Sequence, residues 1–153
     1  MSSQRSAGEL CSREVVTVLR STALNEAARL MRERHVGCLV VVDEGPEGRF
    51  VAGILTDRDI VTAVVAREVS PLMLRVADVM SSDVATISED ASLHQAIALV
   101  ERRGVRRLPV VASGGALVGL LAADDLLRQL AADLRALGDA LGGQRGREPL
   151  VRP

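Results

Sequence analysis

The sequence contains no lysine, tryptophan or tyrosine, and Phe50 is its one aromatic residue. A hydrophobic core must therefore consist of aliphatic side chains, and these are plentiful, since apolar residues make up 48% of the chain. A net charge of −1 and a single aromatic residue argue against nucleic-acid binding, which needs a basic surface and rings that stack on bases. The 153 residues suit one domain or two small packed units.

Other functional classes are excluded by missing motifs. Cys11 and Cys38 are not spaced as metal ligands or as a redox pair, so we expect reduced thiols in a cytoplasmic protein. No signal-peptide segment and no apolar run near the ~20 residues of a membrane span are present, so no membrane association is expected. His35 and His94 have no further ligands at metal-binding spacing. Without a nucleophile motif or a Walker or dinucleotide-binding loop, the chain is predicted not to be an enzyme.

What the sequence does contain is an internal repeat. Ala27 aligns with Ala96 at a shift of 69 positions, and the neighbouring apolar residues align with it. After a turn that is three residues longer in the first copy, Gly53 aligns with Gly119 at a shift of 66. So many matches in order, with one gap in a turn, indicate a duplicated unit.

Each copy shows the same succession of patterns. A short apolar run precedes a stretch with apolar residues three and four positions apart, which predicts a strand and then a helix. Two β-branched runs around a turn predict a hairpin, and a closing helix follows. The fold class is therefore α/β (α+β), in which two units of about 60 residues, each marginal alone, pack face to face and leave clefts. The predicted ranges, in the order strand, helix, strand, strand, helix, are 15–19, 23–34, 38–43, 50–55 and 57–67, then 84–87, 91–103, 108–112, 116–121 and 124–141.

Two motifs link this repeat to a known family. The last strand of the first copy ends in Gly-Ile-Leu-Thr-Asp-Arg-Asp at 53–59, and the second copy contains Gly-Val-Arg-Arg-Leu-Pro-Val-Val at 104–111. Over about residues 8–132 the chain resembles the CBS-domain pair, or Bateman module, and is similar to small stand-alone bacterial proteins of this kind. The resemblance implies two β-α-β-β-α CBS units related by a pseudo-two-fold axis, with a cleft that most often binds an adenosine-containing nucleotide.

The resemblance also implies roles for individual residues. Asp59 matches the carboxylate that accepts hydrogen bonds from the ribose diol, and Thr56 matches a hydroxyl residue near ribose and phosphate at a helix N-terminus. The strand-one segments are implied to line the base pocket, and the arginine pair of the second motif to reach phosphates in some members. The expected ligand-binding residues are Thr17, Val18, Gly53, Thr56, Asp57, Arg58, Asp59, Thr86, Ile87, Arg106, Arg107, Pro109 and Asp125.

Thr56 and Asp59 also fit an interpretation that needs no ligand, because Ser/Thr-x-x-acid at a helix start is typical of a capping box. Both interpretations can hold at once. In the second copy Ala122 replaces the threonine, and Asp124 adds negative charge, so a site built on Asp125 is expected to be empty or to bind a nucleoside-like group. The better phosphate site should combine Thr56 and Asp59 with the arginine pair of the second copy, although that pair could equally be a solvated surface patch.

The last predicted helix carries five leucines spaced three, four, three and four apart. This is a coiled-coil spacing, but it covers barely two heptads, so the leucines fit packing on their own domain about as well as a dimer contact. Homodimers are common in the family, which favours the dimer. Gly142 and Gly143 are expected to end the helix, and 144–153 to form a mobile tail. The leucines are Leu127, Leu130, Leu134, Leu137 and Leu141.

The sequence thus predicts a non-catalytic regulatory sensor, with residues 1–7 as an N-terminal tail, 8–70 and 71–132 as the two units, and 133–153 as a helical extension and flexible tail. Its regulatory ligand would be an adenine nucleotide (AMP, ADP or ATP) or a related small molecule, and no cofactor would be required. We expect a homodimer that regulates an effector protein. The alternative is an oligomerising adaptor that binds no ligand.

Overall fold

The computed structural model describes residues 4–145, with the backbone alone at 144 and 145. The predicted order β-α-β-β-α occurs twice, which confirms the α+β class and the duplication. The elements are α1 (Ala7–Leu10), β1 (Thr17–Leu19), α2 (Leu24–Arg34), β2 (Cys38–Gly45), β3 (Gly48–Thr56), α3 (Asp57–Ile60), the π-helical turn η1 (Val61–Val65), the 3-10 turn η2 (Pro71–Met73), α4 (Val76–Val79), β4 (Ile87–Ser88), α5 (Leu93–Arg103), β5 (Arg107–Val111), β6 (Leu117–Ala122) and α6 (Ala123–Arg145).

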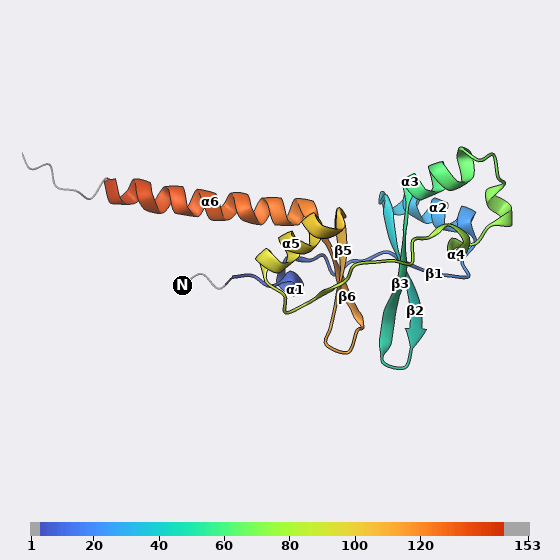
Figure 1. The fold of residues 1–153 in the computed structure, drawn as a ribbon, viewed down its shortest axis with the longest axis horizontal. Coiled ribbons are helices and arrows are strands. Elements are labelled where there is room, and N and C mark those ends of the chain that lie inside the picture. The colour runs from blue at the N-terminus through green and yellow to red at the C-terminus, as the bar shows by residue number, and fades with distance from the viewer. Residues whose placement is uncertain (1–3, 146–153) are drawn as a thin grey trace, which may run out of the picture.

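The strands form two three-stranded sheets of the same topology, β1-β2-β3 and β4-β5-β6, which lie side by side (Figure 1). In each sheet the first strand runs parallel to the second, and the second and third form an antiparallel hairpin. Both hairpins change register at one point, between Val41 and Val42 and between Val110 and Val111. Such an irregularity bends a strand, and the duplication has placed it at corresponding positions in the two sheets.

The helices follow from the sequence to different degrees. α5 begins with a capping box, in which Ser92 Oγ accepts from Gln95 N at 3.2 Å and Ser92 N donates to Gln95 Oε1 at 2.8 Å. α2 and α5 both end in a left-handed residue, at His35 (φ 55°) and at Gly104 (φ 61°). Glycine takes this conformation without steric cost, whereas His35 adopts it as the cap residue that lets the chain turn into β2.

The two closing helices differ from prediction. An α-helix over 57–67 is wrong beyond Ile60, because the chain continues as the π-helical turn η1. β-branched residues crowd this turn, and Thr62 Oγ1 donates to Arg58 O at 2.9 Å, competing for a helix carbonyl. In α6 the predicted stop at Gly142 and Gly143 is also wrong, since the helix runs on to Arg145. Residues 146–153 of the predicted tail lie outside the described residues.

Each sheet and its helices enclose an aliphatic core, and the cores are completed by an exchange of segments. Ala7 is fully buried in the second core, where Ala7 N donates to Ala91 O at 2.8 Å. Val76 of α4 is fully buried in the first core, beside the bond from Leu24 N to Leu74 O at 2.9 Å. Figure 1 accordingly shows α1 beside α5 and β6. The packing units are therefore offset from the sequence ranges 8–70 and 71–132.

Candidate functional site

The motif glycine of the first copy, Gly53 in β3, allows the connection between the two units to pair with that strand. Ile54 N donates to Ser81 O and Ser81 N donates to Ile54 O, both at 2.9 Å. A Cβ atom on Gly53 would lie 2.6 Å from Ser81 O, which is too close for a side chain. Gly119 is constrained in the same way, with 2.7 Å from its Cβ position to Ser12 O. Both glycines thus place backbone against backbone, and at Gly53 this contact lies beside the candidate site, because Ile54 and Ser81 line the cleft.

The motif continues into a capping box at the end of β3. Thr56 Oγ1 accepts from Asp59 N at 3.1 Å, and Thr56 N donates to Asp59 Oδ2 at 2.9 Å. This confirms the capping interpretation. Among the described residues, Asp59 Oδ1 accepts no hydrogen bond and the Thr56 hydroxyl hydrogen has no acceptor. Capping therefore leaves one free acceptor and one free donor on two half-buried side chains.

The second motif keeps half of this arrangement. Ala122 N donates to Asp125 Oδ2 at 2.9 Å, as Thr56 N does to Asp59, but alanine has no hydroxyl to complete the box. The other oxygen of Asp125 lies 3.5 Å from Arg128 Nη1, whose side chain is 80% exposed. The carboxylate oxygen that has no partner in Asp59 thus has a basic neighbour in Asp125.

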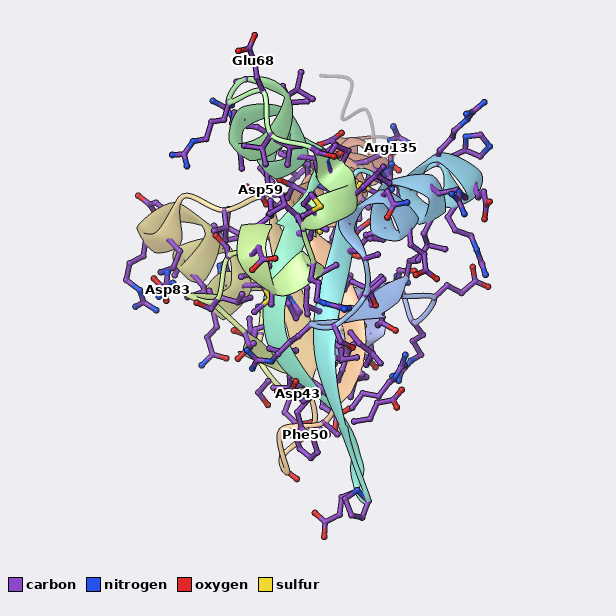
Figure 2. The ribbon with its side chains drawn as sticks, turned by 90° about the vertical axis from the view of Figure 1, so that its right-hand side faces the viewer. Asp43, Phe50, Asp59, Glu68, Asp83 and Arg135 are labelled. Carbon is purple, nitrogen blue, oxygen red and sulfur yellow. The ribbon has the colours of Figure 1, made fainter. Side chains whose placement is uncertain are left out.

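A cleft with a volume of ≈630 Å³ opens beside the first motif, between the two units. It lies toward the helical end of the sheets, near Asp59 and away from Phe50, which lies near the hairpin tips (Figure 2). The side chains of both units that the sequence selects as a phosphate site meet here, and their role in binding stays a prediction. The lining residues are Gly37, Cys38, Ile54, Thr56, Asp57, Arg58, Asp59, Ser81, Asp83, Val84, Ala85, Gly104, Val105, Arg106 and Arg107.

The cleft presents unpaired positive charge next to carboxylates. Among residues 4–143, Arg58, Arg106 and Arg107 make no ion pair and all three are exposed. Asp83 is already paired, since its Oδ1 lies 2.9 Å from Arg103 Nη2. Three guanidinium groups without partners can bind an anion such as phosphate, because each offers a fork of N–H donors.

Cys38 lines the same cleft as a buried thiol. Burial raises its pKa, which Asp59 and Asp57 raise further, while Arg107 acts in the opposite direction. A raised pKa keeps the thiol protonated at neutral pH, so Cys38 is a weak nucleophile. Cys38 lines the cleft together with Asp59 of the first unit and Arg107 of the second.

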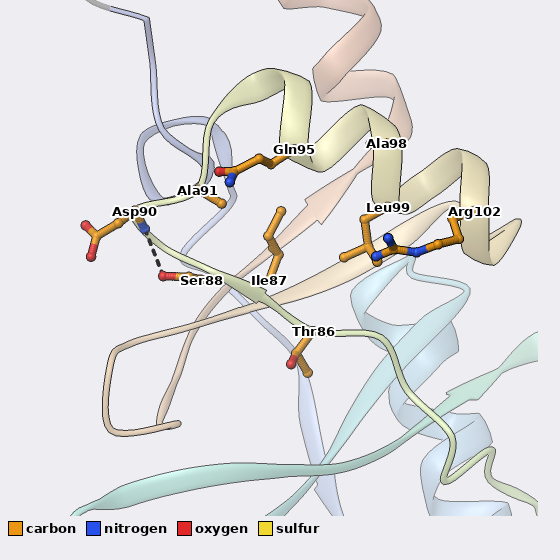
Figure 3. Close-up of a pocket in the computed structure, with 9 residues that line it drawn as sticks. All are labelled: Thr86, Ile87, Ser88, Asp90, Ala91, Gln95, Ala98, Leu99 and Arg102. Carbon is orange, nitrogen blue, oxygen red and sulfur yellow. Dashed lines mark hydrogen bonds between the residues drawn. The ribbon is translucent and has the colours of Figure 1, made fainter.

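Several predicted site residues lie elsewhere. Thr17 and Val18 border a hollow between β1 and α2, and Thr17 Oγ1 accepts from Arg49 Nη1 at 3.1 Å. Thr86 and Ile87 border a groove along α5, where Ile87 points toward the helix and Thr86 away from it (Figure 3). Pro109 is buried in β5.

The cleft instead receives residues that the sequence analysis did not select. Asp83, Val84 and Ala85 lie in the connection between the two units, just before β4. They line the cleft because this connection pairs with β3 at Ser81 and Ile54. The motif glycine is the signal that could have revealed them, since a glycine inside a strand marks a close backbone approach.

The described residues contain neither a membrane-spanning helix nor a metal-binding cluster. Within residues 4–145, no helix is long and apolar enough to cross a membrane. The same part of the chain holds no group of three or more His, Cys, Asp or Glu side chains placed to bind a metal ion.

Comparison with known proteins agrees with this architecture. The CBS domain family matches the chain twice, over residues 7–66 and 76–132. The Methanopyrus kandleri protein MK0525 is 37% identical over 123 residues, which are 80% of this chain and 61% of that protein. The solved structure of a CBS-domain protein from Burkholderia ambifaria is similar with a TM-score of 0.68 and 35% identity, over 79% of this chain and 85% of that one.

A second similar structure is a complex with ATP. The cytosolic domain of the Mg²⁺ channel MgtE, solved in complex with ATP, is 29% identical with a TM-score of 0.69, over 81% of this chain and 48% of that one. The fold is thus that of a tandem module, two repeated units with a cleft between them. The chain belongs to the CBS-domain family and contains two CBS domains in tandem.

Proposed function

We propose that the chain is a non-catalytic sensor that binds an adenosine-containing nucleotide in the cleft between its two CBS domains. The observation that carries the proposal is the meeting of Thr56 and Asp59 from the first domain with Arg106 and Arg107 from the second. The ATP complex of the MgtE cytosolic domain, a structural relative, supports the ligand class.

The free hydrogen-bonding groups suit a nucleotide. Asp59 Oδ1 can accept from the ribose hydroxyls while Oδ2 stays in the capping box. The Thr56 hydroxyl can donate to a phosphate while its oxygen accepts from Asp59 N. Val84 and Ala85 offer an apolar wall for the base, and the arginines would balance the phosphate charge.

Regulation would follow from the position of the cleft. A ligand that contacts both domains favours the relative packing in which both sets of contacts are made, and it shifts the equilibrium by its differential affinity. An effector protein would read that change. No reaction is assigned to the chain, and the nucleotide acts as a regulatory ligand with no cofactor required. The cytoplasmic location expected from the sequence stays a prediction.

The first test is thermal unfolding with and without millimolar AMP, ADP, ATP, S-adenosylmethionine or NAD. A nucleotide at 100 times its Kd should stabilise the protein by about 2.7 kcal/mol, which at this size raises Tm by about 5–15 °C. The shift should disappear in Asp59→Ala and persist in Asp125→Ala. The two aspartates make the same 2.9 Å bond to a backbone N, so the pair separates ligand binding from capping.

One observation favours the alternative of an adaptor without a ligand, namely the missing hydroxyl at Ala122, which leaves one of the two motifs incomplete. The adaptor predicts the same Tm with every nucleotide. A shift that survives in Asp59→Ala would instead place binding outside the proposed cleft.

A further inference from the structure

The outer part of α6 extends away from the rest of the molecule. Leu126 is 4% exposed and Leu130 still packs against the second core. Every residue from 131 to 143 is exposed, and Figure 1 shows the helix continuing past the sheets. At 1.5 Å per residue this exposed part is about 20 Å long.

This exposed helix is poorly suited to stand alone. Isolated helices of such length are marginal in water even when they are rich in alanine. Here Gly138, Gly142 and Gly143 lower the helix propensity further. A helix that runs through three glycines to Arg145 needs stabilising contacts that its own domain does not provide.

One face of α6 carries an apolar stripe that such contacts would cover. The leucines recur at three, four, three and four positions, the spacing of a left-handed coiled coil. Leu127 is 63% exposed, Leu134 70%, Leu137 57% and Leu141 56%, whereas Leu130 is half-buried against the second core. We call these four residues and Leu130 the leucine stripe.

The borders of the leucine stripe fit a second copy of the same helix. Ala131 and Gly138 form one border, where their small size permits close approach, and Arg135 lies just beyond it. Asp133 lies on the opposite border, and its Oδ1 accepts from Gln129 Nε2 at 2.8 Å. In a parallel pair the opposite borders face each other, so Asp133 of one helix faces the side of its partner that bears Arg135. An antiparallel pair would place Asp133 borders together.

We propose that two copies of the chain associate through the leucine stripes of parallel α6 helices. This inference is independent of ligand binding in the cleft. Because the stripe covers only about two heptads, the association should be concentration-dependent and should dissociate on dilution.

The test is sedimentation equilibrium of the full chain from low micromolar to submillimolar concentration. The wild type should approach twice the monomer mass, and Leu134→Glu should remain a monomer throughout. Leu134 is exposed and outside both cores, so the domains should stay folded, which far-UV circular dichroism checks. Ala132→Glu is the matched control, because it adds the same charge on the opposite face of the helix and should leave the dimer intact.

A second variant tests the orientation. Leu141→Cys should form an interchain disulfide under mild oxidation, since equivalent stripe positions meet across a parallel two-fold axis, while Ala132→Cys should not. A wild type that is monomeric at all concentrations, or a Leu134→Glu variant that stays dimeric, would overturn the proposal. A dimer that Leu134→Glu abolishes but Leu141→Cys does not cross-link would overturn the parallel arrangement.

Discussion

Gly53 has no side chain, and this allows the connection between the two domains to pair with β3. Its Cβ position lies 2.6 Å from Ser81 O and 3.0 Å from Met80 Sδ, so any other residue must push the connection away from β3. The cleft wall formed by 83–85 follows directly from that pairing. A glycine selected as a ligand-binding residue therefore acts on the site through the backbone.

We expect Gly53→Ala to destabilise the protein by about 1–3 kcal/mol, the usual cost of overpacking a close contact. Gly114→Ala is the matched control, because nothing lies within 4 Å of its Cβ position, and such surface changes stay within about 0.5 kcal/mol. Urea denaturation followed by circular dichroism measures both. Equal stability of the two variants would show that the β3 pairing yields without cost.

Asp59 and Asp125 occupy the same position in the duplicated motif but differ in the surroundings of one carboxylate oxygen. Each binds the backbone N–H at the start of its helix through one oxygen. The second oxygen is free in Asp59 and lies near Arg128 in Asp125. The sequence alone indicates the missing threonine, but the neighbouring arginine becomes visible only once α6 is in place.

At the scale of the element, the N-terminus of α6 is capped by fewer hydrogen bonds than the N-terminus of α3. α3 has both bonds of a capping box, whereas α6 has only the bond from Ala122 N to Asp125. Residue 122 ends β6, where a β-branched side chain is also well tolerated. The element therefore offers a place to add a hydrogen bond without rebuilding the fold.

Ala122→Thr should stabilise the protein by about 1 kcal/mol, the usual value of an N-cap hydroxyl. Ala122→Val is the control, since it has the shape of threonine without the hydroxyl and should bring no such gain. Urea titrations measure the free energy of unfolding of both variants and of the wild type. If valine stabilised as much as threonine, the gain would come from packing and the capping argument would fail.

At the scale of the whole molecule, the exchange of α1 and α4 ties the domains together. Ala7 begins the first match to the CBS domain family but is buried in the second core, and Val76 begins the second match but is buried in the first core. Each core is therefore completed by a segment from the other repeat.

Ala7→Glu should destabilise the protein by about 3 kcal/mol or more, because a charge would be buried without a partner. Hydrogen exchange should show the loss of protection first in β5 and β6, far from residue 7 in sequence, rather than in β2. Ala77→Glu introduces the same charge on the exposed side of α4 and should change little. Loss of protection confined to β2 and β3 would contradict the exchange.

The repeat, the order of the elements and the aliphatic cores were predicted from the sequence. Periodicity and turn residues are local properties, and the same patterns occur in both copies. So was the meeting of Thr56 and Asp59 with Arg106 and Arg107, through the resemblance to the family. Where β1 and β4 begin could not be predicted, since Val16 and Val84 have the same β propensity as the strand residues that follow them.

The sequence by itself determined that two copies of one unit form two aliphatic cores, because burial of alternating and periodic apolar residues requires it. Tertiary structure alone decided which segment completes each core, which side of each strand faces the cleft, and that α6 continues past Gly142 with its leucine stripe uncovered. The reason is physical. These outcomes depend on contacts between residues that are distant in sequence, and a local sequence pattern does not determine such contacts.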